Sequence, residues 1–137
     1  ILKNKSIILI DDSLVRGTTC GKIVKMLYKA GAKKVHVRIA CPEIKYPDFY
    51  GVDMPTKKEL LSSNKTKNEI CDFLGAASCN FLSVDGLYKA LLKEKRNNSY
   101  PQFSDHYFTG EYPIKALDKL GNEKITQLSL LSNKSSS

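Results

Sequence analysis

The sequence predicts an α/β fold in which a parallel sheet is flanked by helices. Two observations support this prediction. Short apolar runs with β-branched residues recur at residues 6–10 and 34–40, and a segment with helical periodicity lies between them. A strand, a crossover helix and a second strand form the unit from which parallel sheets are built. The chain of 137 residues has room for about one domain.

The first half of the chain contains that unit. A strand is expected at Ser6–Ile10, because an uninterrupted apolar run is typical of a strand covered on both faces of a sheet. A helix is expected from Thr18, since apolar residues from Cys20 to Ala30 repeat on one helical face and Gly31 ends the pattern. Alternating apolar and polar residues then predict a strand over Lys34–Ala40.

Two capping signals predict short helices in the middle of the chain. Thr56–Glu59 and Thr66–Glu69 both have the spacing of a capping box, in which a Thr hydroxyl and a Glu carboxylate bind free amides at a helix start. We therefore expect one helix after each box, the second of them ending at Gly75.

The last regular elements are a short strand at Cys79–Leu82 and a helix that is capped by Ser83 and reaches about Glu94. After Arg96 a turn-rich segment with scattered aromatic residues is expected to be a loop packed on the body. The terminal LSNKSSS is expected to be disordered. Three strands make a narrow sheet, so its N-terminal strands are missing and are expected upstream of Ile1.

Composition argues against several classes of protein. The net charge is +8, but the lysines are spread over helices and loops rather than gathered with aromatic residues, so we expect no nucleic-acid partner. The sequence has no run of 18 apolar residues, so we expect no membrane partner. No two of the four cysteines form a C-x-x-C pair, and their apolar neighbours predict buried free thiols in a cytoplasmic protein.

The stretch IILIDDSLVRGTT carries the strongest chemical signal. Asp11 and Asp12 follow the first strand, at the place where open parallel sheets bind ligands. Adjacent carboxylates repel each other, so a divalent cation or a sugar diol is the expected partner. Residues 17–19 place free amides and hydroxyls at a helix N-terminus, which favours phosphate. Each part alone is also typical of a turn or cap. Together they indicate one ligand that has a diol or a metal ion at one end and a phosphate at the other.

This stretch resembles the phosphoribosyl-diphosphate (PRPP) motif of the type I phosphoribosyltransferases, and in the form DDSLVRGTT it is most similar to the amidophosphoribosyltransferase family. The similarity continues through AGAKKVHVRIACPEIKYPDFYGVDMPTKKEL and FLSVDGLYKAL to YPQFSDHYFTGEYP. The resemblance implies a partial type I phosphoribosyltransferase fold. Residues 1–113 would be the C-terminal part of the transferase domain, and residues 114–137 a C-terminal tail.

The resemblance also implies a function. The family converts glutamine, PRPP and water to 5-phosphoribosylamine, glutamate and diphosphate, the first step of de novo purine nucleotide synthesis. The chain would be the PRPP-binding part. It is expected to be inactive alone, because the family's glutaminase domain and earlier transferase strands have no counterpart in it. Two other interpretations stay open: a PRPP-sensing binding module without transfer activity, and a non-functional truncated gene product.

By the same resemblance, Asp11 and Asp12 hold the ribose hydroxyls and the Mg²⁺ of PRPP, and the loop that follows them wraps the 5-phosphate. The loop residues are Ser13, Leu14, Val15, Arg16, Gly17, Thr18 and Thr19. None of them is expected to act as a nucleophile. Two roles stay open for Arg16: contact with phosphate or a nucleotide inhibitor, and a salt bridge between elements.

The resemblance further implies purine nucleotides as inhibitors and a homo-oligomeric full-length enzyme. No iron–sulfur cluster is expected, because the positions where some family members have cluster cysteines are occupied by residues such as Asp48, Ser104 and Tyr107. His36 is assigned to packing or to the surface. His106 has no carboxylate partner at a useful spacing in the sequence and is assigned no role.

Overall fold

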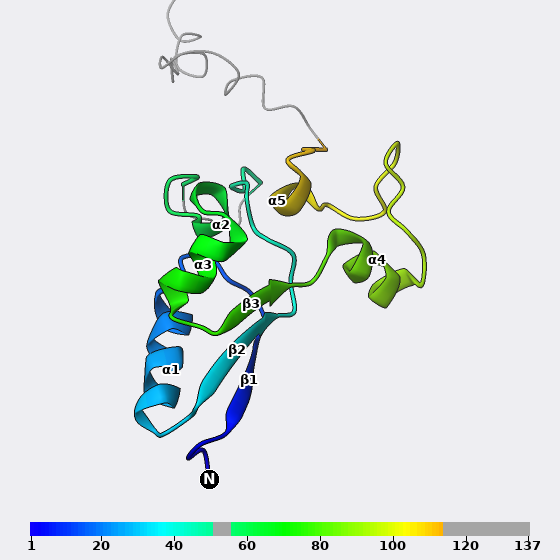
Figure 1. The fold of residues 1–137 in the computed structure, drawn as a ribbon. Helices are drawn as coiled ribbons and strands as arrows, with labels where there is room; N and C mark the ends of the chain where they lie inside the picture. The colour runs from blue at the N-terminus through cyan, green and yellow to red at the C-terminus, as the bar shows by residue number, and fades with distance from the viewer. Residues whose placement is uncertain (51–55, 114–137) are drawn as a thin grey trace, which may run out of the picture.

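The computed structural model describes residues 1–50 and 56–113 of the chain. Its elements follow one another as shown in Figure 1: β1 (Ser6–Asp11), α1 (Thr18–Lys29), β2 (Lys34–Ile39), α2 (Leu61–Asn64), α3 (Lys67–Leu74), β3 (Ser78–Phe81), α4 (Val84–Leu92) and α5 (His106–Thr109). The predicted α/β class is confirmed. The proposed tail at 114–137 and the expected disorder at its end lie outside the described residues.

The three strands form one parallel sheet in the order β1-β2-β3 (Figure 1). Asp11 at the end of β1 pairs with Ile39 of β2, and Ile39 pairs in turn with Phe81 of β3. The carboxyl ends of the three strands therefore meet at one edge of the sheet, where the loops that follow them can share a site.

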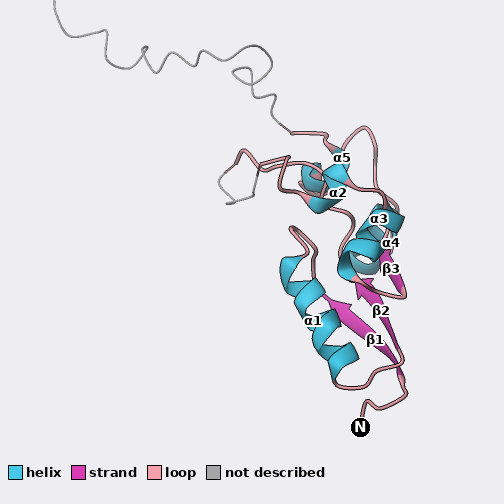
Figure 2. Cartoon of the chain, turned by 60° about the vertical axis from the view of Figure 1, so that its left-hand side comes forward, coloured by secondary structure: helices cyan, strands magenta, loops and turns pink. Residues whose placement is uncertain are grey.

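Helices α1 and α3 cover one face of this sheet. Figure 2 shows α1 lying along one side of the strands. Because side chains alternate between the two faces of a strand, every second residue of β2 points into this layer. The buried core contains, from β2, α1 and α3, Val35, Val37, Ile39, Cys20, Val24, Ile70 and Leu74.

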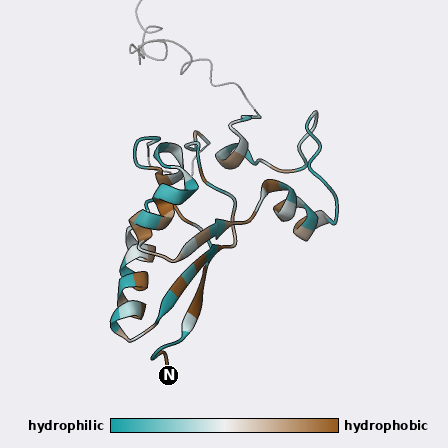
Figure 3. Ribbon diagram, viewed as in Figure 1, coloured by the Kyte–Doolittle hydropathy of each residue, from teal (hydrophilic) through white to brown (hydrophobic). Residues whose placement is uncertain are grey.

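The other face of β1 is exposed in the described part of the chain. Figure 3 shows apolar residues along β1 and β2. Of those in β1, Ile7 and Leu9 pack against the core, whereas Ile8 and Ile10 are 64% and 71% exposed. The prediction that this strand is covered on both faces is therefore wrong for the described residues. An apolar run shows that a strand can be buried, but it does not show how many layers cover it.

His36 lies on the same exposed face, in β2. Its Nδ1 is 2.8 Å from the hydroxyl of Ser78 in β3, and Arg38 donates to that hydroxyl at 3.0 Å. These contacts link neighbouring strands, as expected for a residue engaged in packing.

The capping box at Thr66 begins α3 as predicted. The Thr66 hydroxyl accepts a hydrogen bond from the Glu69 amide, and the Glu69 carboxylate accepts one from the Thr66 amide at 2.7 Å. The helix ends at Gly75, which adopts the left-handed conformation with φ of 68°. Local sequence is sufficient to define both ends of this helix.

The box at Thr56 does not begin a helix, contrary to the prediction. Glu59 accepts hydrogen bonds from the amide and the hydroxyl of Thr56, but these close only a single turn. Leu60 then adopts an extended conformation and is completely buried, and the helix α2 begins at Leu61. Burial of Leu60 thus interrupts the helix that the box alone would favour.

The boundaries of β3 and α4 differ slightly from the prediction. β3 begins and ends one residue earlier than expected. Ser83 caps α4 as predicted, its hydroxyl accepting a hydrogen bond from the Gly86 amide at 3.0 Å. The helix ends at Leu92 rather than near Glu94, because Lys93 adopts a left-handed conformation with φ of 60°.

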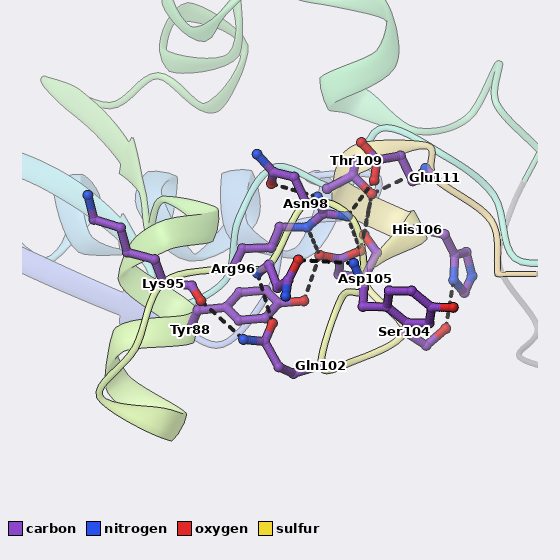
Figure 4. A network of polar contacts seen from close by, with 12 residues as sticks. Tyr88, Lys95, Arg96, Asn98, Gln102, Ser104, Asp105, His106, Thr109 and Glu111 are labelled. Carbon is purple, nitrogen blue, oxygen red and sulfur yellow. Dashed lines mark hydrogen bonds and ion pairs between the residues drawn. The ribbon is translucent and has the colours of Figure 1, made fainter.

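The segment after α4 packs against the body as predicted, around a buried ion pair (Figure 4). Arg96 Nε lies 2.5 Å from Asp105 Oδ2, and both side chains are buried. The hydroxyl of Tyr88 in α4 donates to the same carboxylate at 2.8 Å, and Arg96 also contacts Glu111 at 2.7 Å. The four-residue helix α5 was not predicted, because so short a helix shows no periodicity.

Burial alone would raise the pKa of Asp105, but hydrogen bonds from Arg96 and Tyr88 outweigh it and hold this pKa below its ordinary value. A carboxyl group with a lowered pKa in the folded state stabilises the fold above its unfolded pKa. This contribution is lost as the pH falls through the folded pKa.

We predict that Arg96→Met lowers the free energy of unfolding at pH 7 by about 3 to 5 kcal/mol, because it leaves the Asp105 carboxylate buried without its cation. Urea denaturation measures this difference, which should shrink below about pH 4 as Asp105 becomes neutral. Lys95→Met, which removes a neighbouring exposed cation, is the control. Equal losses in the two variants would contradict a role for the buried pair.

Candidate functional site

The candidate site is the loop that joins β1 to α1 at the carboxyl edge of the sheet. It borders a cavity of about 250 Å³. The predicted residues that line the cavity are Asp11, Ser13, Leu14, Val15, Arg16, Gly17, Thr18 and Thr19. Asp12 does not line it but lies between two residues that do. The loop thus brings the predicted site residues together.

The two carboxylates shape the start of the loop. Asp11 Oδ1 accepts a hydrogen bond from the Asp12 amide at 3.1 Å, and Asp12 Oδ1 accepts one from the Ser13 amide at 2.7 Å. These bonds turn the chain at the end of β1 and use one oxygen of each carboxylate. The second oxygens accept no hydrogen bond from residues that the structure describes, so they can serve a ligand.

This donor set fits Mg²⁺ only if the ligand completes the coordination. Within residues 1–50 and 56–113, no group of three or more His, Cys, Asp or Glu side chains could hold a metal by itself. Mg²⁺ is commonly bound through one or two carboxylates together with substrate phosphates and water. Asp11 and Asp12 match the protein's share of such a site.

The other end of the loop presents hydrogen-bond donors. Gly17 is the N-cap of α1 and has no side chain to bind the free amides of the first turn, which also contains no acidic residue. Thr18 and Thr19 are exposed and add two hydroxyls. Free amides at the positive end of the helix dipole favour an anion. The cavity therefore combines the Asp11 carboxylate at one end with anion-binding groups at the other, and Asp12 lies beside it in the chain.

Three contacts to the body hold the loop in this shape. Leu14 is buried in the core, and the carbonyl oxygen of Val15 accepts a hydrogen bond from the Leu61 amide at 2.9 Å. Gly17 adopts φ of 73°, and a Cβ atom there would lie 2.7 Å from Leu61 Cδ2. Glycine is thus required at this position by both conformation and space.

Arg16 forms an ion pair between elements, one of the two roles that the sequence leaves open. Its Nη2 and Nε lie 3.0 and 3.2 Å from Glu59 Oε1. The hydrogen bond from Arg16 is the largest influence on the pKa of Glu59 and lowers it. Glu59 belongs to the first of the two capping signals, Thr56–Glu59, which predicts a helix start but does not predict this contact with Arg16.

Two thiols lie beside the carboxylates. Burial raises the pKa of Cys20, and the charge of Asp11 raises it further. Cys41 has a raised pKa for the same reasons, with Asp12 as the nearby charge. Both thiols therefore stay protonated at neutral pH and are poor nucleophiles. All four cysteines of the chain are free, as predicted, but only Cys20 and Cys79 are buried, whereas Cys41 and Cys71 are partly exposed.

A second polar cluster surrounds His106, and here the prediction of no carboxylate partner is wrong. His106 Nε2 lies 2.8 Å from Asp48 Oδ1, and Nδ1 lies 3.0 Å from the Ser104 hydroxyl, which Figure 4 shows beside the ring. The side chains of His106 and Asp48 are 1% and 0% exposed. Tyr107 also donates a hydrogen bond to Asp48. The partner is 58 residues away, so sequence spacing gives no signal for it.

We predict that Gly17→Ala destabilises the chain by about 2 to 3 kcal/mol, because the new Cβ meets Leu61 and the backbone keeps a positive φ. Gly75→Ala is a matched control, since Gly75 has φ of 68° but no atom within 4 Å of the added Cβ. It should lose only the backbone contribution, about 1 kcal/mol. Denaturant midpoints compare the two, and equal losses would show that the contact with Leu61 is unimportant.

No protein-family model matches the chain, but curated amidophosphoribosyltransferases do. The enzyme of Rhizobium etli is 48% identical over 134 residues, which are 97% of this chain and 27% of that enzyme. The enzyme of Staphylococcus aureus is 48% identical over 124 residues, covering 90% of this chain and 25% of the relative. That of Methanocaldococcus jannaschii is 55% identical over 91 residues, covering 66% and 19%.

Two solved structures have the same fold. The glutamine PRPP amidotransferase from B. subtilis, complexed with ADP and GMP, matches with a TM-score of 0.75 and 41% identity over 84% of this chain and 25% of that one. A structure described as the allosteric regulatory enzyme of purine biosynthesis matches with a TM-score of 0.70 and 41% identity, over 83% and 24%. These similarities confirm the partial phosphoribosyltransferase fold.

The chain spans about a quarter of the length of the Rhizobium and Staphylococcus relatives. Within that span, sequence and fold agree on the same family, and the motif-bearing loop lies at the carboxyl edge of the shared sheet. The chain belongs to the amidophosphoribosyltransferase family.

Proposed function

We propose that residues 1–113 form the C-terminal, PRPP-binding part of an amidophosphoribosyltransferase domain, followed by a tail at 114–137. The observation that supports this proposal best is the loop cavity, which is lined by Asp11 and by the uncapped N-terminus of α1, with Asp12 next to Asp11 in the chain. PRPP has a ribose diol and a diphosphate at one end and a 5-phosphate at the other. The loop offers groups of the matching chemistry to each end.

In this proposal each half of the loop has its own task. Asp11 and Asp12 bind the ribose hydroxyls and Mg²⁺, while the amides and hydroxyls of residues 17–19 bind the 5-phosphate together with the rest of the loop, residues 13–16. Mg²⁺, when bound, neutralises charge on the diphosphate. The loop thereby orients the anomeric carbon toward the incoming nucleophile.

The proposed reaction is a displacement at that carbon. Hydrolysis of glutamine by water gives glutamate and ammonia. Ammonia forms the new C–N bond as the C–O bond to diphosphate breaks, and loss of a proton from nitrogen gives 5-phosphoribosylamine and diphosphate. Positive charge develops on the ribose as diphosphate leaves, and the nearby carboxylates of Asp11 and Asp12 stabilise it. No residue of the loop has to act as a nucleophile, which agrees with the protonated thiol of Cys20.

We further propose purine nucleotides as inhibitors, because a nucleoside monophosphate carries the same ribose and 5-phosphate groups as PRPP. The B. subtilis relative is complexed with ADP and GMP. A homo-oligomeric enzyme in the cytoplasm is the proposed setting, and the four free thiols are typical of a reducing compartment. No helix in the described part of the chain is long and apolar enough to cross a membrane.

Replacing both carboxylates, Asp11→Asn and Asp12→Asn together, is expected to weaken Mg²⁺-dependent PRPP binding at least about tenfold, because the metal and the diol lose their charged acceptors. Isothermal titration calorimetry with PRPP in the presence and absence of Mg²⁺ measures this loss. Asp72→Asn, which removes a carboxylate from α3, is the control. An unchanged isotherm in the double variant would reject the assigned roles.

Diphosphate release separates binding from catalysis. We expect the purified 137-residue chain to release no diphosphate from PRPP in a glutamine-dependent reaction, and the whole protein in which this chain occurs to do so. A coupled assay for diphosphate measures both. Glutamine-dependent release of diphosphate by the 137-residue chain would contradict the proposal that the chain is inactive alone. Binding without release in the whole protein would favour a PRPP-sensing module.

A further inference from the structure

The ion pair between Arg16 and Glu59 joins the proposed phosphate loop to the turn that precedes α2. We propose that Glu59 is a positioning residue that competes with the ligand's phosphate for the Arg16 guanidinium and so limits the affinity of the loop for anions. This inference rests on the proposed function, because it assumes that the loop binds a phosphate group.

Arg16 is placed to serve either partner. It lines the loop cavity, and it also reaches Glu59 through two of its nitrogen atoms, at 3.0 and 3.2 Å from a single carboxylate oxygen. A guanidinium has five N–H donors in one plane, and the contact with Glu59 uses two of them. The three remaining N–H donors can bind phosphate in the two-pronged manner for which arginine is favoured.

Glu59, by contrast, is held in place without Arg16. Its other carboxylate oxygen, Oε2, accepts hydrogen bonds from the amide and the hydroxyl of Thr56, both at 3.2 Å. The turn itself is anchored to the loop, because the Leu61 amide donates to the carbonyl oxygen of Val15 at 2.9 Å. Glu59 is therefore a fixed acceptor beside the cavity, and the arginine side chain is the partner that can move.

The pair is weak enough to exchange. The side chains of Arg16 and Glu59 are 55% and 46% exposed, so water and salt screen their attraction. A bound phosphate carries more charge than one carboxylate and lies at the helix N-terminus, where the dipole holds it. We expect Arg16 to pair with Glu59 in the free loop and with phosphate in the occupied loop.

A double-mutant cycle in the whole protein tests this exchange, with ribose 5-phosphate as the probe ligand in calorimetric titrations. Glu59→Gln should tighten binding about threefold, because the amide still accepts from Thr56 but no longer holds the cation. Arg16→Gln should weaken binding about tenfold. In the Arg16→Gln background, Glu59→Gln should not change the affinity further, because the guanidinium for which Glu59 competes is absent.

The chain supplies a closely matched control in its other capping box. Glu69 accepts from the amide and the hydroxyl of Thr66 in the same way as Glu59 does from Thr56, but no arginine contacts it in the described residues. Glu69→Gln should leave the affinity for ribose 5-phosphate unchanged. Thermal unfolding of each variant separates a loss of folding from a change in binding.

The outcomes distinguish this inference from the proposed function. If Glu59→Gln weakens binding, or changes it equally with and without Arg16, competition is overturned while the phosphate site stands. If the wild-type protein binds neither ribose 5-phosphate nor PRPP, the proposed function fails and the competition with it. A threefold gain in affinity in Glu59→Gln that depends on Arg16, with no gain in Glu69→Gln, supports the assignment of Glu59 as a competitor for Arg16.

Discussion

Three side chains of β2, those of Val35, Val37 and Ile39, are buried beneath α1 and α3, and the other elements take their positions from this contact. Burial of one face sets the register of β2, and the neighbouring strands align their carboxyl ends with it. The turn from β1 into α1 must then cross that edge. The packing of β2 therefore places the candidate site at the carboxyl edge of the sheet.

The loop contains both buried residues, which pack into the core, and residues that are exposed to solvent. Leu14, Gly17 and Cys20 are buried, whereas Asp12, Arg16 and the two threonines are exposed. Buried positions fix the path of the backbone, so the amides of the first helical turn keep their direction without a ligand. Exposed positions supply the charges and hydroxyls, and of these Arg16 has a protein partner that a ligand can replace.

Local signals predicted the strands, the helix α1 and the box that starts α3, because each depends on neighbours within one or two turns. The same signals failed where a distant contact decides the outcome. Thr56–Glu59 and Thr66–Glu69 have the same spacing, yet only the second begins a helix, since Leu60 is withdrawn into the core after the first. The contact between Glu59 and Arg16 spans 43 residues and leaves no periodic trace in the sequence.

The cluster around His106 brings together residues that lie far apart in the sequence. Asp48 and Ser104 each bind one ring nitrogen of His106, and Tyr107 donates a hydrogen bond to Asp48. The amides of residues 45 and 46 donate to the carbonyl oxygen of Tyr107 as well. Hydrogen bonds thus fasten the segment after β2 to α5. Because a buried carboxylate without a partner is costly, the contact with His106 stabilises Asp48 in this position.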